Sequence, residues 1–132
     1  MSSTNRGSTR SPLDYYRTPA WCVRALWATC LDLRFVKEAY DPACGDGAIL
    51  LALRELDPAP GLHLYGSDVD AGRVSAACEA GLVAHCLDYM APAQMGGGGQ
   101  FARAAIVTNP PYALAEAFVR RAIERGTNRP VA

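Results

Sequence analysis

The chain has 132 residues, with 13 basic and 13 acidic side chains, a formal net charge of zero and 50% hydrophobic residues. This length corresponds to one domain, and the hydrophobic share excludes a wholly disordered chain. Zero net charge gives no general argument for nucleic-acid binding, and no apolar run approaches the ~20 residues of a membrane-spanning helix, so we expect no membrane partner.

The N-terminal residues predict a leader and then a helix. Residues 1–14 are polar and contain no apolar core, so we expect a disordered leader and not a signal peptide. Residues 15–132 then form the folded domain. Thr18 and Pro19 are typical of a helix start, where Thr18 accepts a hydrogen bond from a free backbone N–H and Pro19 takes the first helical position. Apolar residues recur at helical spacing through residues 23–34.

Strands and helices alternate along the rest of the chain. This alternation with short links predicts βαβ units, and therefore an α/β fold in which helices cover both faces of a parallel sheet. Asp70 is expected to cap one helix and Gly81 to close it. The predicted strands cover residues 39–43, 62–68, 82–87 and 104–108, and a further one begins at 130–132. The predicted helices cover residues 48–56, 71–80 and 113–125.

Four polar or glycine-rich clusters fall at the ends of four predicted strands. They are residues 41–47, 67–70, 88–89 and 109–112. In doubly wound sheets, ligands bind beyond the carboxyl ends of the strands, where the strand order reverses. The four clusters would therefore meet in one crevice.

The residue types of these clusters suit a ligand with hydroxyl and amino groups. Gly45 and Gly47 would let the backbone approach a ligand closely, although the third glycine of a dinucleotide fingerprint is missing. Asp41 could pair with an ammonium group, Asp68 could accept from two ribose hydroxyls, and Asp88 could accept from an exocyclic amine. Together they predict a pocket for an adenosine that carries an amino acid. A tight turn at the glycines and a solvated helix cap at Asp68 are the alternatives.

Two motifs resemble those of the S-adenosylmethionine-dependent N6-adenine DNA methyltransferase family. Residues 41–47 (DPACGDG) resemble its cofactor loop, and residues 109–112 (NPPY) resemble its catalytic motif. Thr18 and Pro19 resemble a T-P-P motif that closes the cofactor pocket in one subclass, with Ala20 in place of the second proline. The resemblance spans residue 17 to about residue 125. It implies the N-terminal half of a Rossmann-like class I methyltransferase sheet, with the strand order 3-2-1-4.

The resemblance also implies S-adenosylmethionine as the cofactor and roles for individual residues. Asp68 would contact the ribose and Asp88 the adenine amine of the cofactor. The other implied cofactor-binding residues, most of them at the methionine part, are Thr18, Asp41, Ala43, Gly45 and Gly47.

The NPPY motif implies a role in holding the target adenine of DNA. Asn109 and the Pro110 carbonyl would accept hydrogen bonds from its amino group, whose lone pair is otherwise delocalised into the ring. Tyr112 would stack on the base after the base has been flipped out of the duplex. Pro110 and Pro111 would stiffen the loop, so that little backbone freedom is lost on binding.

The resemblance stops where such a sheet is half built, and this leaves three accounts open. The chain would be a truncated enzyme, which is the interpretation we favour, one part of a split enzyme whose sheet is completed by a second chain, or a vestigial cofactor binder. The predicted strand at 104–108 would then have an unpaired apolar edge. Methyltransferases of RNA bases or of protein glutamine, and a non-catalytic adenosine-binding module, are the alternative functions.

The remaining signals are less specific. Five cysteines without C-x-x-C spacing predict mostly buried thiols in a reducing cytoplasm, with no disulfide framework and no metal site. Trp21 and Trp27 are predicted to pack in the core. Four arginines near the C-terminal end could meet phosphates, although a solvated helix face is the simpler interpretation: Arg120, Arg121, Arg125 and Arg129.

Overall fold

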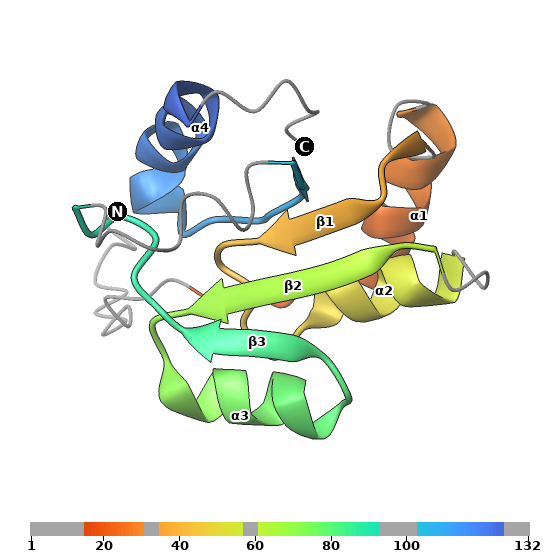
Figure 1. Ribbon diagram of the computed structural model, residues 1–132, viewed down its shortest axis with the longest axis horizontal. Coiled ribbons are helices and arrows are strands. Elements are labelled where there is room, and N and C mark those ends of the chain that lie inside the picture. Colours follow the sequence, from red (N-terminus) through yellow and green to blue (C-terminus); the bar gives the residue numbers. More distant parts are fainter. Residues whose placement is uncertain (1–14, 31–34, 57–60, 93–102, 126–132) are drawn as a thin grey trace, which may run out of the picture.

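A four-stranded parallel sheet forms the centre of the computed structural model (Figure 1). The structure describes residues 15–30, 35–56, 61–92 and 103–125. The strands lie in the order β3-β2-β1-β4, and every neighbouring pair is parallel. The predicted α/β class and the strand order 3-2-1-4 are therefore confirmed. The strands are β1 (Glu38–Asp41), β2 (His63–Asp68), β3 (Val83–Cys86) and β4 (Ala105–Ile106).

Helices cover both faces of this sheet, as predicted. Three of them lie on one face and α4 lies on the other (Figure 1). A short 3-10 helix, η2, leads directly into α4. The helices are α1 (Ala20–Thr29), α2 (Ala48–Leu56), α3 (Ala71–Glu79), η2 (Tyr112–Leu114) and α4 (Ala115–Glu124).

Alternating side chains of the central strands build the core on the two faces. In β1, Ala39 packs with Leu53 of α2, whereas Tyr40 packs with Phe118 of α4. Both strand residues are at most 2% exposed. This alternation follows from the period of two in a strand, which turns successive side chains to opposite faces. The central strand is thus fixed from both sides, and its carboxyl end has a defined position.

The reversal of strand order places the carboxyl ends of β1, β2 and β4 along one edge. β1 pairs with β2 on one side, with Asp41 opposite Gly66, and with β4 on the other, with Tyr40 opposite Ile106. Beyond β4, Val107 N–H still donates to the Tyr40 carbonyl at 3.1 Å. The loops that follow these strands therefore begin side by side at the switch point.

The two ends of α3 are capped by the residues that the sequence predicted. The Asp70 carboxylate accepts a hydrogen bond from Arg73 N–H at 3.0 Å, as an N-cap residue does. Gly81 ends this segment with φ of 84°. Both predictions are confirmed.

The structure corrects the predicted start and extent of α1. Pro19, not Thr18, is the N-cap residue, and no side chain caps the helix. The helix ends at Thr29 because Cys30, with φ of −94° and ψ of 87°, lies outside the helical region. Helical spacing predicted a helix through residues 23–34, of which 31–34 are outside the described residues. Trp27 packs against the core, but Trp21 is 64% exposed, so its predicted packing is wrong.

Further predictions need correction or concern residues outside the described part of the chain. β4 is shorter than the predicted 104–108, and α4 begins at Ala115 because residues 112–114 form η2 instead. The cysteines are not mostly buried: Cys44 is buried, whereas Cys78 and Cys86 are exposed. The leader 1–14 and the strand at 130–132 lie outside the described residues. None of the described helices is long and apolar enough to cross a membrane.

Candidate functional site

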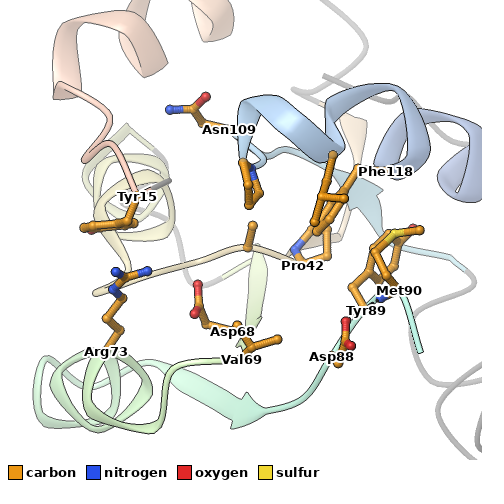
Figure 2. A pocket seen from close by; sticks show the side chains of 13 residues that line it. Tyr15, Pro42, Asp68, Val69, Arg73, Asp88, Tyr89, Met90, Asn109 and Phe118 are labelled. Carbon is orange, nitrogen blue, oxygen red and sulfur yellow. Dashed lines mark hydrogen bonds between the residues drawn. The ribbon is translucent and has the colours of Figure 1, made fainter. Parts of the chain in front are cut away.

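A cavity of about 180 Å³ lies at the carboxyl edge of the sheet, between the end of β2 and the loops after β1, β3 and β4 (Figure 2). Each of the four strand-end clusters contributes residues to the lining of this cavity. The clusters therefore meet in one place, as predicted. The predicted site residues in the lining are Ala43, Asp68, Asp88, Asn109 and Pro111. Apolar side chains form much of the remaining wall, among them Pro42, Val69, Leu114 and Phe118.

Asp68, at the end of β2, ties the loop after β1 to the cavity. Its carboxylate is 7% exposed; Oδ2 accepts from Gly45 N–H and Oδ1 accepts from Asp70 N–H, both at 2.9 Å. A carboxylate oxygen can accept more than one hydrogen bond. Asp68 can therefore hold the loop and still accept from a ligand in the cavity.

Asp41, at the end of β1, is a buried carboxylate. It is 1% exposed, and its Oδ1 accepts from Ala43 N–H at 3.0 Å. Burial raises its pKa to about 7, and the nearby negative charge of Asp68 adds to the rise. Asp41 forms no ion pair with any other described residue. A cationic ligand nearby would favour its charged form.

Thr18, Asp41, Ala43 and Asn109 line a smaller hollow beside the main cavity. Ala43 and Asn109 belong to both linings. The predicted contacts to a methionine group are thus adjacent to the predicted contacts to an adenosine.

Asp88 lies after β3 and is exposed at the rim of the cavity. Its Oδ1 accepts from Met90 N–H at 2.9 Å, which fixes the orientation of the carboxylate. The next residue, Tyr89, is 2% exposed and packs against Phe118, with ring centroids 5.1 Å apart. The buried ring anchors the segment, and the neighbouring carboxylate remains accessible to a ligand.

Asn109 is held by the N-terminal segment. Its Nδ2 donates to the Tyr16 carbonyl and to Thr18 Oγ1, both at 3.2 Å. A carbonyl oxygen only accepts, so the amide nitrogen must be the end that faces Tyr16. Figure 2 shows this side chain above the cavity. Within the described part of the chain, no group donates a hydrogen bond to Asn109 Oδ1, which remains a free acceptor.

The rest of the NPPY motif divides between the cavity and the surface. Pro111 lines the cavity, whereas Pro110 is half-buried and not part of the lining. Tyr112 is 65% exposed and lies outside the cavity. Its ring stacks on Tyr16, with centroids 5.1 Å apart and an interplanar angle of 15°.

Gly45 and Gly47 support the site without lining the cavity. Gly45 has φ of 55° and Gly47 has φ of 91°, a region of the backbone that favours glycine. A Cβ at Gly45 would overlap the Tyr15 ring, and one at Gly47 would overlap Leu82. The glycines thus allow the loop to pack closely.

Residues 15–18 form a segment that we call the N-terminal strap. Most of its contacts with the site were not predicted from the sequence. Tyr15 lines the cavity, and its hydroxyl donates to Asp46 Oδ1 at 2.7 Å. Arg17 Nε forms an ion pair with Asp46 Oδ2 at 2.8 Å. The Arg73 guanidinium lies 4.2 Å from the Tyr15 ring centroid (Figure 2). Tyr15 and Asp46 are 31 residues apart, so no local signal identified this contact.

The protonation states of Tyr15 and Asp46 strengthen the contact between the strap and the loop after β1. Burial, followed by the hydrogen bond to Asp46, raises the pKa of Tyr15 to about 12, so its hydroxyl keeps its proton. Burial alone would raise the pKa of Asp46, but the hydrogen bonds from Arg17 and Tyr15 outweigh it and lower this pKa below its ordinary value. Asp46 is therefore charged at neutral pH and holds both strap residues.

The described C-terminal arginines are engaged within the chain. Arg120 pairs with Glu116 at 2.8 Å, and Arg121 donates to the Ala91 carbonyl. The Arg125 guanidinium lies 4.7 Å from the Tyr89 ring centroid. Arg129 is outside the described residues. These contacts favour the interpretation as a helix face over a dedicated phosphate site.

Comparison with known proteins adds no family: no protein-family model and no curated protein matches the chain. Among the described residues, no group of three or more His, Cys, Asp or Glu side chains is arranged to hold a metal ion. The fold and the site define a parallel α/β protein with a strand-end cavity that combines carboxylates, an asparagine side chain and apolar walls.

Proposed function

We propose that the chain supplies the cofactor site and the catalytic loop for methyl transfer from S-adenosylmethionine to the N6 amino group of adenine in DNA. The observation that supports this most is that Asn109, whose Oδ1 accepts no hydrogen bond from any described residue, lines the same cavity as Asp68 and Asp88. The sheet would be the N-terminal half of a class I methyltransferase fold. The resemblance of residues 41–47 and 109–112 to that family's motifs points the same way.

The cavity fits the chemistry of this cofactor. Apolar walls at Val69 and Phe118 suit an adenine ring, and the second oxygen of Asp88 suits its amine. The remaining lone pairs of Asp68 suit ribose hydroxyls. Asp41, buried and without a described ion pair, suits a ligand that carries positive charge.

Bound S-adenosylmethionine would supply an electrophilic methyl group beside the catalytic loop. Asn109 Oδ1 and the Pro110 carbonyl would accept the two hydrogens of the adenine amine. These hydrogen bonds favour a tetrahedral nitrogen, whose lone pair is free to attack. The exposed Tyr112 ring would stack on a base that has left its duplex.

A second chain that completes the sheet remains part of this proposal. β4 is the outer strand of the described sheet, and no other described strand pairs with its far side. Transfer would then be stronger in the presence of that chain, whereas cofactor binding would not need it, because the cavity is lined by described residues of this chain alone.

Calorimetry with S-adenosylmethionine, followed by label transfer, tests the proposal. We expect binding to the wild-type chain and an affinity about tenfold lower for Asp88→Asn, which replaces a charged acceptor. Glu116→Gln is the matched control, because Glu116 is an exposed carboxylate on α4 that does not line the main cavity.

Label transfer should go to adenine-containing DNA and not to RNA or protein. Transfer to RNA or to glutamine would replace the substrate in this proposal. Binding without transfer to any of them would favour a non-catalytic module. Absence of binding would refute the cofactor site itself.

A further inference from the structure

We propose that Tyr16 and Thr18 of the N-terminal strap are positioning residues for the target base, because they hold Asn109 and Tyr112 in the orientation that receives it. This inference rests on the proposed function, since it assigns the base to the same two side chains. It gives the strap a role beyond closing the cofactor pocket.

The first observation is the orientation of the Asn109 amide. Its two N–H groups are directed to the Tyr16 carbonyl and to Thr18 Oγ1, both at 3.2 Å. An asparagine amide that rotated by half a turn would present donors, instead of an acceptor, to an amine. The two acceptors on the strap oppose this rotation, because the Tyr16 carbonyl has no hydrogen to offer to Oδ1.

The second observation is the aromatic stack. The Tyr16 and Tyr112 rings lie 5.1 Å apart at 15°, yet the two residues are 49% and 65% exposed. The stack restrains the Tyr112 ring, while the large exposed area leaves room for a base against it. Tyr16 therefore restrains both residues that are predicted to bind the base. Its carbonyl holds Asn109, and its ring holds Tyr112.

The strap is itself fixed on both sides of Tyr16. Tyr15 and Arg17 each contact one oxygen of Asp46, at 2.7 Å and 2.8 Å. Pro19 then caps the start of α1, with its carbonyl accepting from Cys22 N–H. A segment anchored at both ends can orient a third group with little loss of freedom on binding. The base subsite would thus be ordered before a base arrives.

Thr18 also explains why the predicted helix cap is absent. Its hydroxyl oxygen accepts from Asn109 and not from a free N–H of α1. The hydroxyl hydrogen remains able to donate into the hollow beside Asp41, whose volume of about 10 Å³ holds at most one water molecule. Thr18 would then link the catalytic amide to the wall of the cofactor site.

The first test uses Thr18→Val, which removes the acceptor at nearly constant shape, and Thr18→Ser, which keeps it. The readout is hydrogen exchange of the Asn109 side-chain amide by NMR, with its signal identified by its loss in Asn109→Asp. We expect faster exchange in Thr18→Val and restoration in Thr18→Ser. Thr29→Val on α1 is the control. Unchanged exchange in Thr18→Val would overturn the inference, whether or not the chain transfers methyl groups.

The second test measures base binding with a single-stranded oligonucleotide that contains 2-aminopurine, whose fluorescence falls when it stacks on an aromatic ring. We expect quenching by the wild type and by Tyr16→Phe, and on the order of tenfold weaker binding by Tyr16→Leu and Thr18→Val. Equal binding of the oligonucleotide by all variants would overturn the inference.

The two proposals fail in different ways. If the wild type binds the oligonucleotide with this pattern but transfers no methyl group, base positioning is supported and methyl transfer is refuted. If the wild type transfers methyl groups and Tyr16→Leu and Thr18→Val transfer them at the same rate, the function is supported and the positioning role is refuted. If the wild type does not bind the oligonucleotide, the positioning role fails.

Discussion

Asp41→Asn should change how the stability of the protein depends on pH. The carboxylate of Asp41 is 1% exposed, and burial raises its pKa from an ordinary 3.8 to about 7. The folded protein therefore binds this proton more tightly than the unfolded chain does. The contribution of Asp41 to stability is therefore greatest where both states are protonated, and it falls as the pH rises from about 4 to about 7.

The size of this effect follows from the two pKa values. Each pH unit between them corresponds to 1.36 kcal/mol, so the full range from 3.8 to about 7 corresponds to about 4 kcal/mol. Between pH 5 and pH 8 the part that can be measured is roughly 3 kcal/mol. Asparagine has nearly the shape of the protonated acid and can still accept from Ala43 N–H, but it does not titrate.

Urea denaturation of the wild type and of Asp41→Asn at several pH values measures this directly. Other titrating groups contribute equally to both proteins, so the difference in the free energy of unfolding isolates Asp41. We expect this difference to shift in favour of Asp41→Asn by roughly 3 kcal/mol from pH 5 to pH 8. A difference that stays constant over this range would refute the raised pKa and the buried position of the carboxylate.

Three further substitutions test the strap, a cap and the core. Asp46→Asn should release Tyr15 and Arg17 and weaken S-adenosylmethionine binding about two- to fivefold by calorimetry, since the exposed ion pair is worth at most about 1 kcal/mol. This difference should vanish as the pH falls through the lowered pKa of Asp46. Asp70→Ala removes the N-cap of α3 and should lower the free energy of unfolding by about 1 kcal/mol in urea denaturation. Leu53→Ala creates a cavity at a residue that is 1% exposed and should cost about 2–5 kcal/mol in the same assay.

Each of these predictions has its own contrary result. Equal cofactor affinity of Asp46→Asn and the wild type would show that the strap does not close the pocket. An unchanged free energy of unfolding in Asp70→Ala would show that the Asp70 cap does not stabilise α3. Glu79→Ala, at the other end of the helix, is the control for this substitution. A cost below 1 kcal/mol for Leu53→Ala would contradict its place in the core.

Signals that act within a few residues of the chain predicted the fold well. α2 was predicted at its observed bounds, because its apolar stripe is continuous and a breaker follows it. The parallel order of strands followed from their alternation with helices. The Asp70 cap needs only a partner three residues away, and so it was also visible in the sequence.

Long-range competition explains what the sequence did not reveal. Thr18 was predicted to cap α1, but Asn109, 91 residues away, donates to its hydroxyl instead. The contact between Tyr15 and Asp46 joins residues that are 31 positions apart, and no sequence pattern predicts it. Trp21 was expected in the core because of its residue type, yet α1 buries only Val23 among its residues.

The central claim is that one cavity brings a sulfonium donor to the side chain that holds the target amine. A crystal structure of the chain with an S-adenosylmethionine analogue, in which an amine replaces the methyl-bearing sulfonium, measures this most directly. The account predicts the adenosine between Asp68 and Asp88, with the amine of the analogue facing Asn109 Oδ1. An adenosine bound away from this cavity, or an amine turned away from Asn109, would contradict it.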